Sequence, residues 1–210
     1  MELNEPLIRT GHPPHPSGNK KIRLLPARVF KATLLFAIFL LSFHLPQPSF
    51  ESKNRQESVR EIFAVLERHP TGLANVTKEE LAEFIYEEAS RYNHDPKFIL
   101  ALIAIESEFK TWAVSQKGAK GLMQIMPEVG QLLAQEMGIE WSGDRTLFNP
   151  FLNIRMGVYY LSQLMDYFND PLIALTAYNY GPTYVQNLIE RNERLPANYY
   201  RRILSVYQTL

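Results

Sequence analysis

Apolar residues recur every three or four positions along most of the chain after residue 48, which is the spacing of one face of an α-helix. The first such segment carries its apolar side chains at Val59, Ile62, Phe63 and Leu66. The next carries them at Leu81, Phe84, Ile85 and Tyr92. No segment shows sustained period-two alternation with β-branched residues, the pattern of a half-buried strand. The pattern therefore predicts an all-α domain.

Signals for helix starts divide this domain into separate helices. The stretch Thr77–Glu80 has the sequence of a capping box, and Asp95–Pro96 pairs an N-cap residue with a proline at the first helical position. The same device recurs at Asn149–Pro150 and Asp170–Pro171. Further helices are expected to begin at Pro127, near Pro182 and near Ala197. The helical spacing also predicts core residues at Met156, Tyr160, Leu161, Leu164 and Tyr167.

The first 75 residues differ in charge and composition from the rest of the chain. Residues 1–31 contain six basic and two acidic residues together with several prolines, and we expect them to form a basic cytoplasmic tail. Residues 32–45 are apolar and fit either a cleaved signal peptide or an uncleaved anchor in the inner membrane. Residues 46–75 are expected to form a linker and an accessory helix, and residues 76–210 the main domain. This order predicts that the domain lies in the periplasm.

Composition argues against several classes of function. The 210-residue chain has no cysteine, which excludes thiol chemistry and a disulfide framework. Its formal net charge is zero, and this argues against nucleic acid as a partner because phosphate binding usually needs a basic surface. The sequence also lacks a glycine-rich phosphate loop and a metal-ligand spacing of histidine, aspartate or cysteine. We therefore expect neither a metal nor a cofactor.

One acidic residue, Glu106, ends an apolar run that begins at Ile99. It falls in the last turn of the helix that starts at Pro96, where the helix dipole and the apolar neighbours both disfavour a carboxylate. Both effects raise the pKa of the acid toward the range of a general acid at neutral pH. The alternative is an exposed glutamate, because Glu108 and Lys110 fit a solvated rim. Position alone does not decide between these two interpretations.

Short motifs around Glu106 favour the catalytic interpretation. Residues 106–109 read Glu-Ser-Glu-Phe, and residues 113–127 read Ala-Val-Ser-Gln-Lys-Gly-Ala-Lys-Gly-Leu-Met-Gln-Ile-Met-Pro. Residues 177–182 read Ala-Tyr-Asn-Tyr-Gly-Pro, after an Asn-Pro pair at 149–150 and Asn-Ile-Arg-Met-Gly at 153–157. This ordered set closely resembles the soluble lytic transglycosylase (SLT domain) family, and the likeness extends from about Leu81 to Leu204.

The resemblance implies a goose-type lysozyme-like helical fold, with residues 76–210 as the catalytic domain. It implies cleavage of the β-1,4 bond between N-acetylmuramic acid and N-acetylglucosamine in peptidoglycan. Glu106 would protonate the glycosidic oxygen and then take a proton from the C6 hydroxyl of the muramic acid, which attacks C1 and leaves a 1,6-anhydro end. Such an attack gains from proximity and needs no activated water. By the same likeness, the substrate-binding positions are Ser115, Gln124, Met126, Tyr178, Asn179 and Tyr199.

A second catalytic carboxylate is not expected, although ordinary glycosidases use two. Glu108 would point away from Glu106 on a continuing helix, and Glu128 sits at a predicted helix start that favours an acid for electrostatic reasons alone. Asp144 is a third candidate for which a structural role is also favoured. The family's acidic motif before the last helix is missing here, and Glu193 is its nearest replacement, so we carry over no acidic helper.

Two other functions stay open at this point: a hydrolytic lysozyme on the same fold, and a non-catalytic peptidoglycan-binding or secretion-scaffold module. The expected partner is the glycan strand of peptidoglycan. The inner membrane, through residues 32–45, and a secretion or division complex are further candidate partners.

Overall fold

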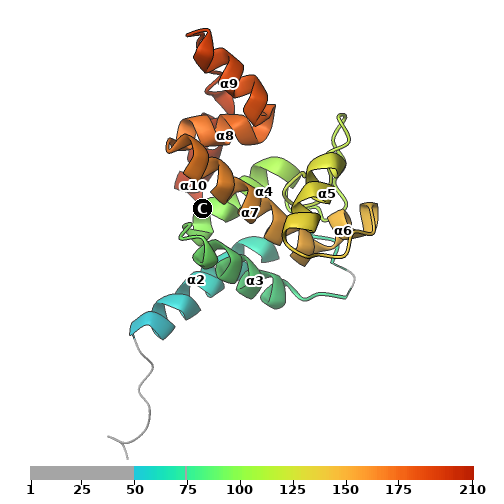
Figure 1. The fold of residues 1–210 in the computed structure, drawn as a ribbon. Coiled ribbons are helices and arrows are strands. Elements are labelled where there is room, and N and C mark those ends of the chain that lie inside the picture. Colours follow the sequence, from blue (N-terminus) through green and yellow to red (C-terminus); the bar gives the residue numbers. More distant parts are fainter. Residues whose placement is uncertain (1–49, 74) are drawn as a thin grey trace, which may run out of the picture. The chain divides into compact units, whose positions relative to one another are not determined.

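The structure, a computed structural model, describes residues 50–73 and 75–210. The tail and the apolar segment predicted over residues 1–45 lie outside the described residues. Every regular element in the described part is an α-helix (Figure 1), which confirms the predicted all-α class. Among these residues, no helix combines the length and the apolar composition needed to cross a membrane. The helices are α2 (Phe50–Glu67), α3 (Lys78–Arg91), α4 (Pro96–Ser107), α5 (Pro127–Glu136), α6 (Asp144–Phe148), α7 (Pro150–Phe168), α8 (Pro171–Tyr180), α9 (Pro182–Glu190) and α10 (Asn198–Thr209).

The helices begin at the capping residues that the sequence predicts. The Thr77 side chain accepts a hydrogen bond from the backbone N–H of Glu80, and the Glu80 carboxylate accepts one from the backbone N–H of Thr77. This reciprocal pair is the predicted capping box at the start of α3. The helices α4, α7 and α8 each combine a side-chain N-cap with a proline in the first turn, and the caps are Asp95, Asn149 and Asp170. The predicted starts of α5, α9 and α10 are confirmed as well.

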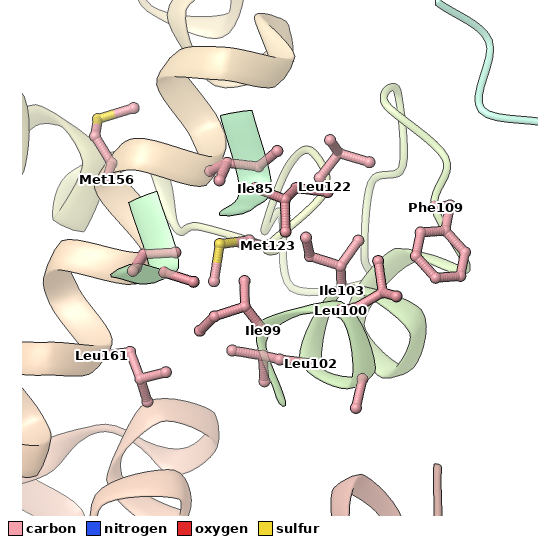
Figure 2. Packing of buried hydrophobic residues seen from close by; sticks show 14 of the residues in the cluster. Ile85, Ile99, Leu100, Leu102, Ile103, Phe109, Leu122, Met123, Met156 and Leu161 are labelled. Carbon is pink, nitrogen blue, oxygen red and sulfur yellow. The ribbon is translucent and has the colours of Figure 1, made fainter. Parts of the chain in front are cut away.

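The helix α4 runs through the centre of the hydrophobic core. Its residues from Ile99 to Ile103 are all buried. Figure 2 shows these side chains meeting others from α3, from the loop after α4 and from α7, and the labelled contributors include Ile85, Leu122, Met123, Met156 and Leu161. Because α4 is fixed on several sides, its last turn holds Glu106 in a defined position.

The helix α2 lies in the segment predicted to contain an accessory helix. Its buried residues Ile62, Val65 and Leu66 belong to the same core cluster as those of α4. On the surface, Arg55 of α2 forms ion pairs of 2.6 and 2.8 Å with Glu83 and Glu87 of α3. The boundary between residues 75 and 76 stays a prediction.

One group of predicted core residues on α7 needs correction. Met156, Leu161 and Leu164 are buried as expected. Tyr160 is partly buried: it packs against the hydrophobic core as expected, and it also lines a cavity. Tyr167 is 65% exposed, so its assignment to the core is wrong. Helical spacing places Tyr167 on the apolar stripe, but spacing does not ensure that a neighbouring element covers the last turn of a helix.

Candidate active site

A cavity of about 600 Å³ opens beside the end of α4. Its walls come from α4, from the loop between α4 and α5, from α7, and from the corner between α8 and α9. The predicted site residues that line it are Glu106, Ser115, Gln124, Met126, Tyr178 and Asn179. The remaining one, Tyr199, reaches Glu106 from α10 through a hydrogen bond. The structure therefore brings all seven predicted site residues together.

Glu106 is held at the point where α4 ends. The helix closes at Glu108, which adopts a left-handed backbone conformation with φ of 51°. The Glu106 side chain is largely buried, and burial raises its pKa from 4.5 to about 7 because a carboxylate loses its hydration there. The hydrogen bond from Tyr199 and the positive charge of Arg202 oppose this rise. The result is an acid whose pKa lies near neutral pH.

Two tyrosines lie close to this acid. The Tyr199 side chain is only 4% exposed, and its hydroxyl donates to the Glu106 carboxylate. The Tyr178 hydroxyl donates to the backbone carbonyl of Met123 at 2.8 Å. Burial, with a smaller effect from the negative charge of Glu106, raises the pKa of both phenols well above the ordinary value. Both tyrosines therefore stay protonated and act as hydrogen-bond donors.

The loop from Ser115 to Ile125 is shaped by its own polar residues. The Ser115 hydroxyl oxygen accepts a hydrogen bond of 3.0 Å from the backbone N–H of Ala119. The side-chain nitrogen of Gln124 donates to the carbonyls of Ala113 and Gly121, at 3.2 and 2.9 Å. These contacts use both protons of that amide nitrogen. Gln124 can thus offer a ligand its side-chain carbonyl oxygen, and Ser115 its hydroxyl proton.

A buried asparagine on α7, Asn153, fixes the same loop through hydrogen bonds. Asn153 accepts a hydrogen bond from the N–H of Met123 at 2.7 Å and donates to the carbonyls of Lys120 and Leu147 at 3.0 and 2.9 Å. A Cβ atom added at Gly121 would lie 2.3 Å from the Asn153 side chain, and Gly121 has a φ of +80°. The loop can approach α7 this closely only with glycine at that position.

Within residues 50–73 and 75–210, Glu106 is the only residue with a carboxylate that lines the cavity. Glu108 is exposed and pairs with Lys110 at 2.8 Å, and this contact lowers its pKa below the ordinary value. Asp144 pairs with Lys120 at 2.5 Å. Two further candidates, Glu128 and Glu193, are exposed and lie outside the cavity lining. The same part of the chain contains no cluster of acidic, histidine or cysteine side chains able to hold a metal ion.

Sequence reasoning missed three residues at this site. Tyr160 packs against the core as its spacing predicts, but it also lines the cavity and contacts the Tyr178 ring at a centroid distance of 5.6 Å. Asn153 appeared only inside a motif. Arg202 acts on the charge of Glu106. Its position three residues after Tyr199, on the same face of α10, is a signal that could have identified it.

Comparison with known proteins identifies the family. The model of the transglycosylase SLT domain matches residues 83–200, which is more than half of the chain. The chain belongs to this family. The resemblance seen in the sequence motifs is thereby confirmed.

Several relatives are similar to this chain over part of their length. A membrane-bound lytic murein transglycosylase C of Actinobacillus pleuropneumoniae is 31% identical over 129 residues, covering 60% of this chain and 35% of the relative. A protein of the same name from Shigella sonnei is 27% identical over 187 residues, covering 83% of this chain and 50% of the relative. This SLT-domain chain thus spans between about a third and a half of these relatives.

The crystal structure of the 70 kDa soluble lytic transglycosylase of Escherichia coli shares the fold. The superposition has a TM-score of 0.54 and 20% sequence identity, and it covers 78% of this chain and 30% of that one. At this identity the comparison supports the fold and nothing finer. It confirms the predicted lysozyme-like helical architecture.

Proposed function

We propose that this SLT domain is a peptidoglycan lytic transglycosylase that cleaves the β-1,4 bond between N-acetylmuramic acid and N-acetylglucosamine. The observation that carries the proposal is Glu106, a single carboxylate with a pKa of about 7 in the wall of a cavity. Membership of the SLT family and the names of the relatives support the same class of reaction.

Glu106 serves first as an acid and then as a base in this proposal. The protonated side chain gives its proton to the glycosidic oxygen, and the bond from that oxygen to C1 of the muramic acid breaks. The C6 hydroxyl of the same sugar then attacks C1 and returns its proton to the Glu106 carboxylate. The bond formed is the 1,6-anhydro bridge, and Glu106 ends in its starting state. A pKa near the working pH suits both steps.

Among the residues that the structure describes, no second carboxylate lines the cavity, and this favours the proposed route over two-carboxylate hydrolysis. Retaining and inverting glycosidases place a second acid about 5 to 10 Å from the first, either as a nucleophile or to activate water. An attack by the substrate's own hydroxyl needs neither function. Hydrolysis by a water molecule on the same fold is the competing outcome that product analysis must test.

The remaining predicted residues are assigned roles that follow from their free groups. Asn179 is exposed at the cavity wall and offers its amide to an N-acetyl group. Gln124 offers a carbonyl oxygen and Ser115 a hydroxyl proton, while Met126 packs against a sugar. Tyr178 holds the loop through its hydrogen bond to Met123, and Tyr199 orients Glu106 through its hydrogen bond to the carboxylate.

The cellular setting is also part of the proposal. We infer a periplasmic domain held at the inner membrane by residues 32–45, since relatives of the chain carry the name membrane-bound lytic murein transglycosylase. Glycan strands of peptidoglycan are the proposed substrate. A secretion or division complex stays a candidate partner.

Digestion of purified sacculi followed by mass spectrometry of the products tests the reaction. We expect muropeptides with 1,6-anhydromuramic ends from the natural protein. We expect Glu106→Gln to reduce their formation at least 100-fold, in line with the typical range of about 10² to 10⁴ for a general acid. The matched control is Glu108→Gln, which removes an exposed carboxylate two residues away and should leave activity unchanged. Reducing muramic ends would indicate a lysozyme, and the absence of any cleavage would indicate a binding module.

A further inference from the structure

Two exposed tyrosines lie at the corner between α8 and α9. Tyr180 is the last residue of α8 and is 42% exposed, and Tyr184 lies in α9 and is 48% exposed. Their ring centroids are 5.8 Å apart, and the ring planes differ by 32°. The two exposed rings thus pack against each other, and we call them the tyrosine pair.

The tyrosine pair continues the wall of the cavity that contains Glu106. Tyr180, Gly181 and Pro182 line that cavity, whereas Tyr184 lies outside its lining. Gly181 has a φ of 91° and joins the two helices directly, and Pro182 begins α9 at once. This short connection holds the pair in a fixed relation to the cavity. The pair therefore joins an aromatic ring of the cavity wall to a second exposed ring outside the lining.

The fold itself does not use the tyrosine pair as core. Neither ring belongs to the two buried hydrophobic clusters of the described residues or to the side chains packed against them. The neighbouring Tyr178 and Tyr199 differ, because their hydroxyls are committed to Met123 and Glu106. The exposed faces of Tyr180 and Tyr184 are therefore available to a ligand.

We propose that the tyrosine pair is a carbohydrate-binding subsite for a pyranose ring of the glycan strand, next to the sugars held at Glu106. This inference rests on the proposed glycan-cleaving function and extends it to substrate length. A pyranose ring has a flat face of C–H groups that packs well on an aromatic ring, and the polar edge of tyrosine suits the surrounding hydroxyls. Tyrosine also gives a large contact area with little loss of side-chain entropy. An extended strand gains contact here that a short fragment cannot reach.

Binding measurements with a non-cleaving protein test the subsite separately from the reaction. The parent is the full chain carrying Glu106→Gln, and the probe is a length series of purified glycan strands without peptide cross-links. We expect Tyr180→Ala and Tyr184→Ala each to raise the Kd for long strands by about three- to tenfold, the range for one aromatic contact. The increase should shrink as the strands become shorter. Tyr184→Phe keeps the ring and should retain the parent Kd within about twofold.

The chain offers a matched control in Tyr167. This residue is 65% exposed and packs edge-on against Phe168 at 4.8 Å, but it lies outside the cavity lining. Tyr167→Ala should leave the Kd unchanged for every strand length. Thermal unfolding of all variants verifies that the fold is intact.

Each outcome bears on one proposal. Equal Kd values for the parent and the double variant Tyr180→Ala/Tyr184→Ala overturn the subsite, even if the natural protein digests sacculi. The subsite is overturned as well if the parent binds no strand. If the tyrosine-dependent binding is found while the natural protein yields reducing ends, or no cleavage, the subsite stands and the proposed reaction fails.

Discussion

Glu106 destabilises the folded protein at neutral pH because its carboxylate is buried. Its pKa is about 7 in the fold and close to 4.5 in an exposed chain. Because the folded pKa is the higher one, the folded protein is favoured when Glu106 is protonated. This stabilisation is complete below about pH 4.5 and is lost as the pH rises through 7. The difference corresponds to about 3 kcal/mol of unfolding free energy.

Replacing Glu106 should therefore stabilise the protein while it removes activity. Glutamine keeps an oxygen that can accept the Tyr199 hydrogen bond, but it never carries a charge. We expect the unfolding free energy of Glu106→Gln to exceed that of the natural protein by an amount that grows from pH 4.5 to pH 8, reaching up to about 3 kcal/mol. Urea unfolding at both pH values measures this. A difference that is the same at both values would contradict the assigned pKa.

Tyr199 sets the protonation of Glu106 in the opposite direction to burial. Its hydroxyl donates to the carboxylate and so stabilises the charged form, which lowers the pKa. We expect Tyr199→Phe to raise the pKa of Glu106 above about 7, because this donor is lost. The fall in kcat/KM at high pH, where Glu106 loses the proton it must donate, should move to higher pH. A pH profile of kcat/KM for both proteins is the measurement, and an unmoved limb would exclude this role.

At the residue scale, the sequence predicted the acid better than its surroundings. An acid that ends the apolar run from Ile99 is visible as an anomaly, because burial of a carboxylate is rare. The contribution of Gln124 to the shape of the loop was not predictable. Its amide nitrogen donates to two backbone carbonyls, and the sequence gives no sign of these contacts. Tyr160 was predicted only as a core residue; it does pack against the core, but helical spacing could not show that it also lines the cavity.

At the scale of elements, the helix starts were predictable because capping is a local interaction. Asp95 and its proline, for example, contact only the first turn of α4. The shape of the loop from Ser115 to Ile125 was not predictable, because Asn153 holds it from a helix about 30 residues further along the chain. A contact of that sequence separation has no local signature.

Asn153 should be among the most sensitive positions of the fold. Replacement by alanine leaves the N–H of Met123 and the carbonyl of Leu147 without their partner in a buried place, and it removes one of the two hydrogen bonds that the Lys120 carbonyl accepts. We expect Asn153→Ala to lower the unfolding free energy by about 3 to 5 kcal/mol, since each unsatisfied group costs about 1 to 3 kcal/mol. Denaturant unfolding measures the loss.

Asn149, the N-cap residue of the same helix, gives the matched control. It is exposed and caps α7 through hydrogen bonds to the N–H groups of Phe151 and Leu152. Asn149→Ala should cost only about 1 kcal/mol, the usual value for a lost N-cap. Similar losses for the two variants would mean that Asn153 does not anchor the loop more firmly than a cap anchors a helix.

At the scale of the described molecule, α2 shares its core with the elements that carry the site. The sequence suggested an accessory helix, because the residues at 69–72 interrupt the pattern and separate it from α3. Spacing along the chain cannot reveal that Leu66 joins the same buried cluster as Ile99. We therefore expect α2 and the helices around Glu106 to unfold as one cooperative unit.

The variant Leu66→Ala tests this cooperativity. Leu66 is completely buried, so its truncation should cost about 2 to 5 kcal/mol, whereas Leu132→Ala removes a side chain that is 61% exposed and should be nearly neutral. Both tryptophans, Trp112 and Trp141, lie outside α2, so their fluorescence reports on the rest of the domain. In a cooperative unit, Leu66→Ala shifts the fluorescence and circular dichroism transitions to lower urea by the same amount. If fluorescence stays at its original midpoint while part of the helical signal is lost earlier, α2 unfolds separately and is an accessory helix in the thermodynamic sense.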